Sequence, residues 1–223
     1  DATRAAATYR SALELDPAFV PALRRLRGAC VATGNYLEAI ELAAREAGLA
    51  AGPEPAAGLV ELGERALAAG DAAAAIQGFE RALEFRAEDP QALAGLARGL
   101  EGAGRLHEAV AAWERAANRL SGARRSDAIR ALGALLAGPL ADGERALQHF
   151  QHASEEEPTV EEWIETLFAL LVKLERFEAA AALGVRRLER TSDPRRRAAI
   201  ALEIGRIHLD RLAEPAEACS WFE

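Results

Sequence analysis

The sequence predicts an all-α protein, a solenoid in which antiparallel helix pairs repeat along the chain. Apolar positions recur at one interval, because Leu93 follows Leu59 by 34 residues and Ala109 follows Ala75 by the same 34. Half of the residues (50%) are hydrophobic and only 5% are aromatic. The abundant Ala, Leu, Arg and Glu are strong helix formers, and the Val, Ile, Thr and Tyr enrichment of a sheet protein is missing. A period of this size indicates a repeat array, in which each repeat contacts only its neighbours.

The best-formed repeats are expected over 56–89 and 90–122. In each, an apolar first helix leads to a turn with glycine, and the second helix has small, aromatic and small residues at i, i+4 and i+7. Small residues let two helices approach to about 8–10 Å, and the aromatic ring fills the remaining gap. Pro90 is expected to open a helix, where its missing N–H costs nothing. The second-helix pattern reads Ala75, Phe79, Ala82 and then Ala109, Trp113, Ala116.

A half-repeat over 1–17 and a full repeat over about 20–52 are expected before this centre. Asp16-Pro17 ends the first helix, because the residue before proline avoids helical geometry. The full repeat has Ala43 where the others place an aromatic, so lighter packing is expected there. Gly52-Pro53-Glu54-Pro55 predicts a slightly lengthened connector to the next repeat.

Three further repeats are expected over 124–158, 160–192 and 194–223, the last of them truncated. In the middle one, Gly184 and Arg187 replace the expected aromatic and alanine. Its second helix is therefore expected to be displaced, or to face something other than the next repeat.

This pattern of helix, tight turn and helix resembles the tetratricopeptide repeat (TPR), and the resemblance covers essentially the whole chain. It implies a right-handed superhelical α-solenoid of antiparallel helix pairs, one array over 1–223 with about six and a half repeats and about 13 helices. The departures include the lack of Trp at the start of most first helices, and Arg27 and Phe168 where the family prefers Gly or Ala. The alternatives are an unrelated helical bundle and another α-solenoid of similar period.

In this family the first helices line a concave groove that holds a peptide or helix of a partner protein. The resemblance therefore implies a protein-interaction scaffold, or a protein that mediates assembly, and neither an enzyme nor a cofactor-binding protein. The Lys/Asn/Arg clamp with which some members hold a C-terminal carboxylate is absent, and the groove positions carry charges of mixed sign. Carried over by register, the candidate groove residues are Arg24, Gly28, Val60, Glu64, Ala94, Arg98, Arg130, Ala134, Glu165, Ala169, Leu202 and Arg206.

Three of these residues, Arg98, Arg130 and Arg206, are the best candidates for contact with an acidic partner. The alternative is a solvated face, because exposed arginine and glutamate are normal on any protein surface. If the groove interpretation is correct, charge reversal at Arg98 and Arg130 should weaken partner binding without unfolding the array.

A metal-dependent enzyme is the second hypothesis. His149 and His152 are three residues apart on one expected helix, with Glu155 and Glu156 a turn later, so two imidazoles and a carboxylate could face one metal ion. The pair lacks the His-Glu-x-x-His arrangement that supplies a general base. Surface histidines beside a core Phe150 are the alternative, and His208 is expected to be a partly buried core histidine.

A nucleic-acid-binding module is the third hypothesis. The formal net charge of −8 argues against it, so no nucleic-acid partner is expected. A steep salt dependence of binding would be its signature. The basic clusters that would carry it are Arg124-Arg125, Arg186-Arg187 and Arg195–Arg197.

The remaining expectations concern the environment of the chain. Cys30 and Cys219 lie near opposite ends of the array, so neither a disulfide nor a zinc site is expected. No apolar run reaches the roughly 18 residues of a membrane span, so no membrane partner is expected. A cytoplasmic location is expected, with the periplasm left open because the chain starts at Asp1 like an excised piece. It also starts and stops inside repeats, so we expect a fragment of a longer array, or ends that stack on a neighbouring copy.

Overall fold

The computed structural model describes residues 2–49, 54–157 and 160–222. Over these residues the chain forms 13 α-helices and no strand, which confirms the predicted all-α class of paired helices. The helices are α1 (Ala2–Leu15), α2 (Val20–Ala32), α3 (Tyr36–Leu49), α4 (Glu54–Ala68), α5 (Ala72–Phe85), α6 (Pro90–Gly102), α7 (Leu106–Ala117), α8 (Gly122–Ala137), α9 (Gly143–Glu156), α10 (Glu161–Lys173), α11 (Phe177–Arg190), α12 (Pro194–Asp210) and α13 (Pro215–Phe222).

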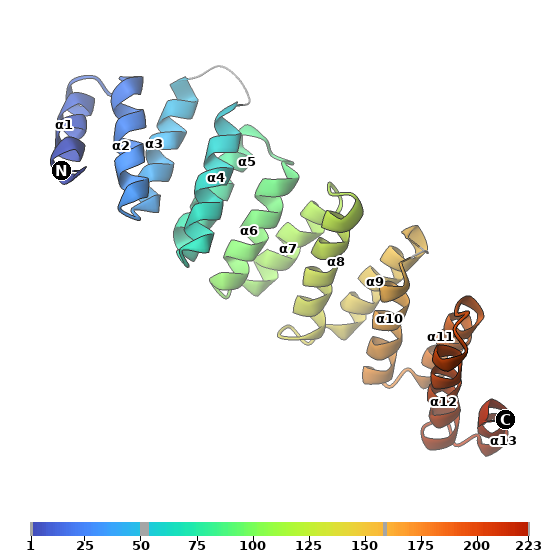
Figure 1. The fold of residues 1–223 in the computed structure, drawn as a ribbon. Helices are drawn as coiled ribbons and strands as arrows, with labels where there is room; N and C mark the ends of the chain where they lie inside the picture. The colour runs from blue at the N-terminus through green and yellow to red at the C-terminus, as the bar shows by residue number, and fades with distance from the viewer. Residues whose placement is uncertain (1, 50–53, 158–159, 223) are drawn as a thin grey trace. The chain divides into compact units, whose positions relative to one another are not determined.

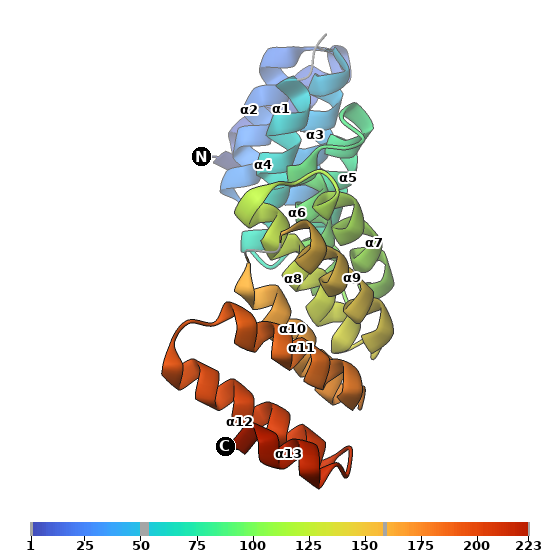
Figure 2. The same cartoon turned by 90° about the vertical axis from the view of Figure 1, so that its right-hand side faces the viewer.

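The chain divides into two compact units, Asp1–Leu132 and Gly133–Glu223, and the boundary falls inside α8. Figure 1 shows the helices of unit 1 side by side in chain order. Within it, the first helices α4 and α6 pack on each other, and the second helices α3 and α5 do the same. Unit 1 therefore has two layers, one of first helices and one of second helices. In unit 2, Figure 2 shows α12 and α13 as an antiparallel pair at the C-terminal end.

A tight turn with one left-handed residue joins the two helices of most repeats. Gly34, Gly70 and Gly104 have φ angles of 75°, 79° and 73°, a conformation that glycine adopts without a steric cost and that commonly ends a helix. Glu175 takes the same place between α10 and α11 with φ 58°. The longer turn between α8 and α9 contains Ala141 with φ 51°. The turns of unit 2 therefore hold side chains where those of unit 1 hold glycine.

The aromatic residue of the second helix packs against glycines of two first helices. Phe79 is fully buried, and a Cβ atom on Gly63 or Gly95 would lie 2.9 or 2.3 Å from its Cε1 atom. Gly63 belongs to the same repeat and Gly95 to the next one, so one ring joins two repeats. In unit 2, a Cβ atom on Gly133 would lie 2.1 Å from Cζ of Phe150. This is the close packing that the small and aromatic pattern predicts.

Helix α11 packs against α12, so the expectation that it faces something other than the next repeat is wrong. Compared with the other repeats, the large residue lies on the first helix α10 and the small residue on the second helix α11. Phe168 on α10 stands where the first helices other than α2, which has Arg27, have Gly or Ala, and the buried Gly184 stands at the aromatic position of α11. A Cβ atom on Gly184 would meet Ile204 of α12 at 2.7 Å and Phe168 at 3.4 Å. These two side chains fill the space of the missing ring, which keeps α11 in the stack.

The N-terminal end of α4 corrects one expected boundary. The helix begins at Glu54, so Glu54 and Pro55 belong to it and not to the expected connector. Proline is tolerated in the first turn of a helix, where its missing N–H has no intrahelical partner. Gly52-Pro53 of that connector, and the expected end of a repeat at Pro158, lie outside the described residues. None of the described helices combines the length and the hydropathy that a membrane crossing requires.

Candidate functional site

The first helices of unit 1 bound a cavity of about 490 Å³, which we call the first-helix groove. Val60 and Glu64 of α4, and Ala94 and Arg98 of α6, line it. Each pair is spaced i, i+4, which puts both side chains on one face of their helix. Four of the predicted groove residues therefore meet in one place, and all four are half-buried or exposed.

Two of these residues form an ion pair between consecutive repeats. Arg98 Nη2 lies 2.5 Å from Glu64 Oε1, and Arg98 Nε also donates to the Ala94 carbonyl at 3.4 Å. Glu64 and Arg98 occupy the same register position, 34 residues apart. Exposed pairs of this kind contribute about 0–1 kcal/mol to stability. The pair balances charge across the groove, so Arg98, one of the candidate contacts for an acidic partner, already has a carboxylate partner within the chain.

The groove also contains residues that the register argument missed. Gln91 and Asp127 lie one helical turn before Ala94 and Arg130 on the same faces, and this spacing could have identified them. Asp127 accepts a hydrogen bond from Arg130 at 2.7 Å. Trp113 of α7 and Leu120 beyond its end also line the groove. Their position depends on how the second helix packs, which the first-helix pattern does not predict. Together they add apolar surface that the first helices alone do not provide.

Arg24 and Gly28 line a different cavity, of about 500 Å³, between α2 and α4. Arg24 Nε bonds Glu46 Oε1 at 2.5 Å, and Arg27 Nη1 bonds Glu46 Oε2 at 2.7 Å. Glu46 stands at the second small position of α3, while Ala43, at the aromatic position, is buried. This repeat therefore has a buried alanine in place of the aromatic ring, and an ion pair between Glu46 and Arg27 one turn further along α3.

The remaining predicted groove residues are more dispersed. Glu165 lines a cavity of about 460 Å³ in unit 2, together with Arg187 and Glu203. Arg187 Nη1 lies 3.1 Å from Glu203 Oε2, and its guanidinium lies 4.8 Å from the centre of the Phe168 ring. The guanidinium of Arg206 has no hydrogen bond or ion pair with any described residue. The four remaining predicted residues are all exposed on helix faces: Ala134, Ala169, Leu202 and Arg206.

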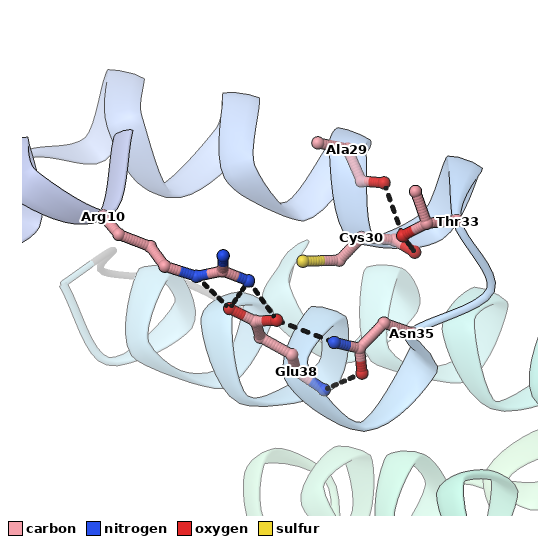
Figure 3. Close-up of polar contacts among 6 residues, drawn as sticks. All are labelled: Arg10, Ala29, Cys30, Thr33, Asn35 and Glu38. Atoms are coloured by element: carbon pink, nitrogen blue, oxygen red, sulfur yellow. Dashed lines mark hydrogen bonds and ion pairs between the residues drawn. The ribbon is translucent and has the colours of Figure 1, made fainter. Parts of the chain in front are cut away.

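A polar cluster joins α1 to the turn between α2 and α3 (Figure 3). Arg10 Nη2 lies 2.8 Å from Glu38 Oε2, and Asn35 Nδ2 donates to the same atom at 2.7 Å. Glu38 raises the pKa of Arg10, chiefly through this hydrogen bond. The Cys30 sulfur points towards the pair (Figure 3), and burial together with Glu38 raises the pKa of the thiol to about 11. A buried thiol of high pKa is a poor nucleophile and metal ligand. The hydrogen bonds of Glu38 with Arg10 and Asn35 link α1 to the start of α3.

The histidine hypothesis finds little support in the geometry. His152 Nδ1 lies 3.1 Å from Glu156 Oε2, one turn further along α9. Across the described ranges, no three His, Cys, Asp or Glu side chains are grouped so that they could hold a metal ion. His208 is half-buried and bonds Glu214 at 2.8 Å, in agreement with a partly buried core position.

The basic clusters are divided among different surroundings. Arg124 lines the first-helix groove. In unit 2, Arg186 and Arg187 line two different cavities. Arg196 lies 3.8 Å from a carboxylate oxygen of Glu161, and Arg197 donates to main-chain carbonyls at the end of α11. Within unit 2, Arg187 and Arg196 line one cavity together with three carboxylates, those of Glu161, Glu165 and Glu203, whereas Arg186 lines another. The basic side chains of unit 2 therefore do not all share one surface.

No family model and no curated protein matches the sequence. Solved structures do match the fold. YrrB, a TPR protein with an unusual peptide-binding site, is 17% identical with a TM-score of 0.52 over 74% of this chain and 82% of its own. A tetratricopeptide repeat protein from Parabacteroides merdae is 15% identical with a TM-score of 0.52 over 91% and 77%. A chain of the Naa15/Naa10 complex bound to HypK-THB is 21% identical with a TM-score of 0.57 over 98% and 31%. At these identities the likeness establishes the fold, which is that of a tetratricopeptide repeat array.

Proposed function

We propose that this tetratricopeptide repeat array is a protein-interaction scaffold that holds a peptide or helix of a partner protein in the first-helix groove. The observation that carries the proposal is the gathering of Val60, Glu64, Ala94 and Arg98 around one cavity of about 490 Å³. The size of the cavity is within the range of about 300–1,000 Å³ that is usual for binding sites. YrrB, which shares the fold, has a peptide-binding site.

The lining suggests which side chains of a partner would enter. Val60, Ala94 and Leu120 offer an apolar surface, and buried apolar anchors supply most of the binding energy at such sites. The Glu64–Arg98 pair balances the charge at the centre. Arg124 is exposed at the edge and forms no ion pair within the described part of the chain. The partner therefore enters with an apolar residue, and an acidic residue beside it meets Arg124.

Filling the groove tests this proposal. Ala94→Trp would occupy the cavity, while Ala111→Trp adds the same side chain at an exposed position of α7. Proteins captured from an extract of the native organism are quantified for the wild type and both variants, and binding of purified candidates is then measured by titration. Loss of a partner with Ala94→Trp but not with Ala111→Trp supports the groove. Equal retention by both variants contradicts it.

Charge reversal addresses the arginines that the sequence pointed to. Arg124→Glu should weaken the binding of an acidic partner more than Arg98→Glu or Arg130→Glu does. The reason is that Glu64 and Asp127 already balance the charges of Arg98 and Arg130. Rim charges act mainly on the association rate and its salt dependence. Stopped-flow association at two salt concentrations measures this, and an unchanged rate for Arg124→Glu would show that the partner is not acidic at that edge.

A further inference from the structure

Unit 2 contains a second cavity, of about 540 Å³, between the second helices α9 and α11; we call it the α9/α11 cleft. Its floor is the apolar stripe of α10, formed by Ile164, Leu167 and Leu171. Leu183 and Ala182 of α11 form one wall. None of the twelve predicted groove residues lines this cleft. Apolar side chains of the core of unit 2 thus line a cleft that can receive apolar side chains from another molecule.

The two walls of the cleft carry opposite charge. Glu155, in the last turn of α9, is exposed on one side, beside the polar Ser154. Arg186 and Arg190 of α11 stand on the other side. A segment that crosses the cleft would therefore meet a carboxylate on one flank and guanidinium groups on the other.

Arg186 differs from Arg45, Arg81 and Arg115, the arginines in the same register of unit 1. Arg81 pairs with Glu84 of its own helix at 3.0 Å. Arg45 and Arg115 likewise follow the aromatic position of their second helix by two residues. They donate to the carbonyls of Pro17 and Ala87 at 2.9 and 2.8 Å, so each holds the loop that leads into its own repeat. Arg186 is exposed and has no hydrogen bond or ion pair with any residue that the structure describes. The three guanidinium groups of unit 1 thus have partners within the chain, whereas that of Arg186 is available for a ligand.

We propose that the α9/α11 cleft binds an amphipathic helix of a partner protein. The apolar ridge of that helix packs on the α10 stripe, whose spacing of i, i+3 and i+7 matches the ridges of a helix. An acidic residue on one flank of the ridge pairs with Arg186, and a basic residue on the other flank pairs with Glu155. This site is separate from the first-helix groove, so the chain can hold two partners, or two segments of one.

A peptide selection tests the cleft directly. A displayed library of amphipathic helical peptides of about 16 residues, roughly four turns, is sorted for binding to the whole protein and against the Ala182→Trp variant, whose ring fills the cleft. Dissociation constants of the selected peptides are then measured by fluorescence anisotropy. The control variants are Arg206→Glu, which reverses an exposed arginine of the same unit, and Ala94→Trp, which fills the first-helix groove.

The expected peptides have an apolar ridge with acidic residues on one flank and basic residues on the other. Arg186→Glu should raise their dissociation constants by roughly tenfold, while Arg206→Glu and Ala94→Trp leave them within about twofold. Ala179→Trp replaces Ala182→Trp if circular dichroism shows that the latter unfolds.

Three results would each overturn the proposal. The first is that no peptide prefers the wild type to the filled variant, and the second is that both arginine variants weaken binding equally. The third is a homodimer in sedimentation that Ala182→Trp dissociates, because the cleft would then belong to a second copy of this chain.

Discussion

At the scale of the residue, glycines that touch an aromatic ring limit what the repeat accepts. A Cβ atom on Gly95 would lie 2.3 Å from the buried Phe79 ring, whereas one on Gly58 meets nothing within 4 Å. Gly95→Ala should therefore destabilise the protein by about 1–3 kcal/mol through overpacking. Gly58→Ala should stabilise it by about 0.4–1 kcal/mol, because alanine restricts the unfolded chain. Urea unfolding of both variants measures the difference, and a Gly95→Ala variant as stable as Gly58→Ala would contradict this packing.

The two thiols should differ in reactivity. Cys30 is buried, and the pKa of its thiol is raised to about 11, whereas Cys219 is exposed. Because the thiolate is the reacting form, a thiol reagent at pH 8 should label Cys219 rapidly and Cys30 only after unfolding. Mass spectrometry of the labelled protein at intervals measures both rates. Equal rates in the native protein would show that Cys30 is accessible.

The same thiol adds a pH dependence to stability. The unfolded thiol has a pKa of about 8.5, and the folded one titrates near 11. The folded state therefore keeps its proton longer, so the contribution of Cys30 is complete below the unfolded pKa and is lost as pH rises towards 11. The loss should be about 1.4 kcal/mol per pH unit within this window. Denaturant unfolding of the wild type and Cys30→Ala between pH 8 and 11 measures it, and a constant difference between them would refute the shift.

At the scale of the element, the exchange of large and small residues between α10 and α11 makes these helices a coupled pair. Gly184→Phe alone should be severely destabilising, because its Cβ would lie 2.7 Å from Ile204 and 3.4 Å from Phe168. Phe168→Gly alone leaves a void, which costs about 2 kcal/mol or more. The double variant restores the order found in the other repeats. It should be more stable than the sum of the single changes predicts, by roughly 0.5–3 kcal/mol. Additive losses in a double-mutant cycle would show that the two residues do not share one space.

At the scale of the whole molecule, the division into two compact units should appear in its energetics. In repeat arrays, stability is approximately a sum of local terms, and parts of a structure can open separately. Gly95→Ala, inside unit 1, should reduce the amide protection of α4 to α7 more than that of α10 to α12. Native-state hydrogen exchange with peptide-level mass spectrometry measures this. Equal losses in all these helices would mean that the chain opens as one cooperative block.

The sequence predicts the repeat and its turns well, because both depend on local spacing. Gly70 and Pro90 mark a turn and a helix start that the structure reproduces. The sequence shows Phe168 and Gly184 as two separate departures from the repeat pattern. That Phe168 fills the space beside Gly184 depends on how α10, α11 and α12 pack together, which the sequence pattern does not show. The groove was predictable from register at Val60, where one helix face settles the position. Trp113 enters the same groove from the second helix, which no single-helix pattern can show.

The ion pair between Glu64 and Arg98 has a consequence for regulation. Glu64 belongs to the same chain and already pairs its carboxylate with Arg98. It therefore competes with any acidic ligand for that arginine. Such a ligand must first displace Glu64, and the released carboxylate then repels it. Glu64→Gln should therefore relieve this self-competition and make the array bind acidic peptides more tightly than the natural sequence does.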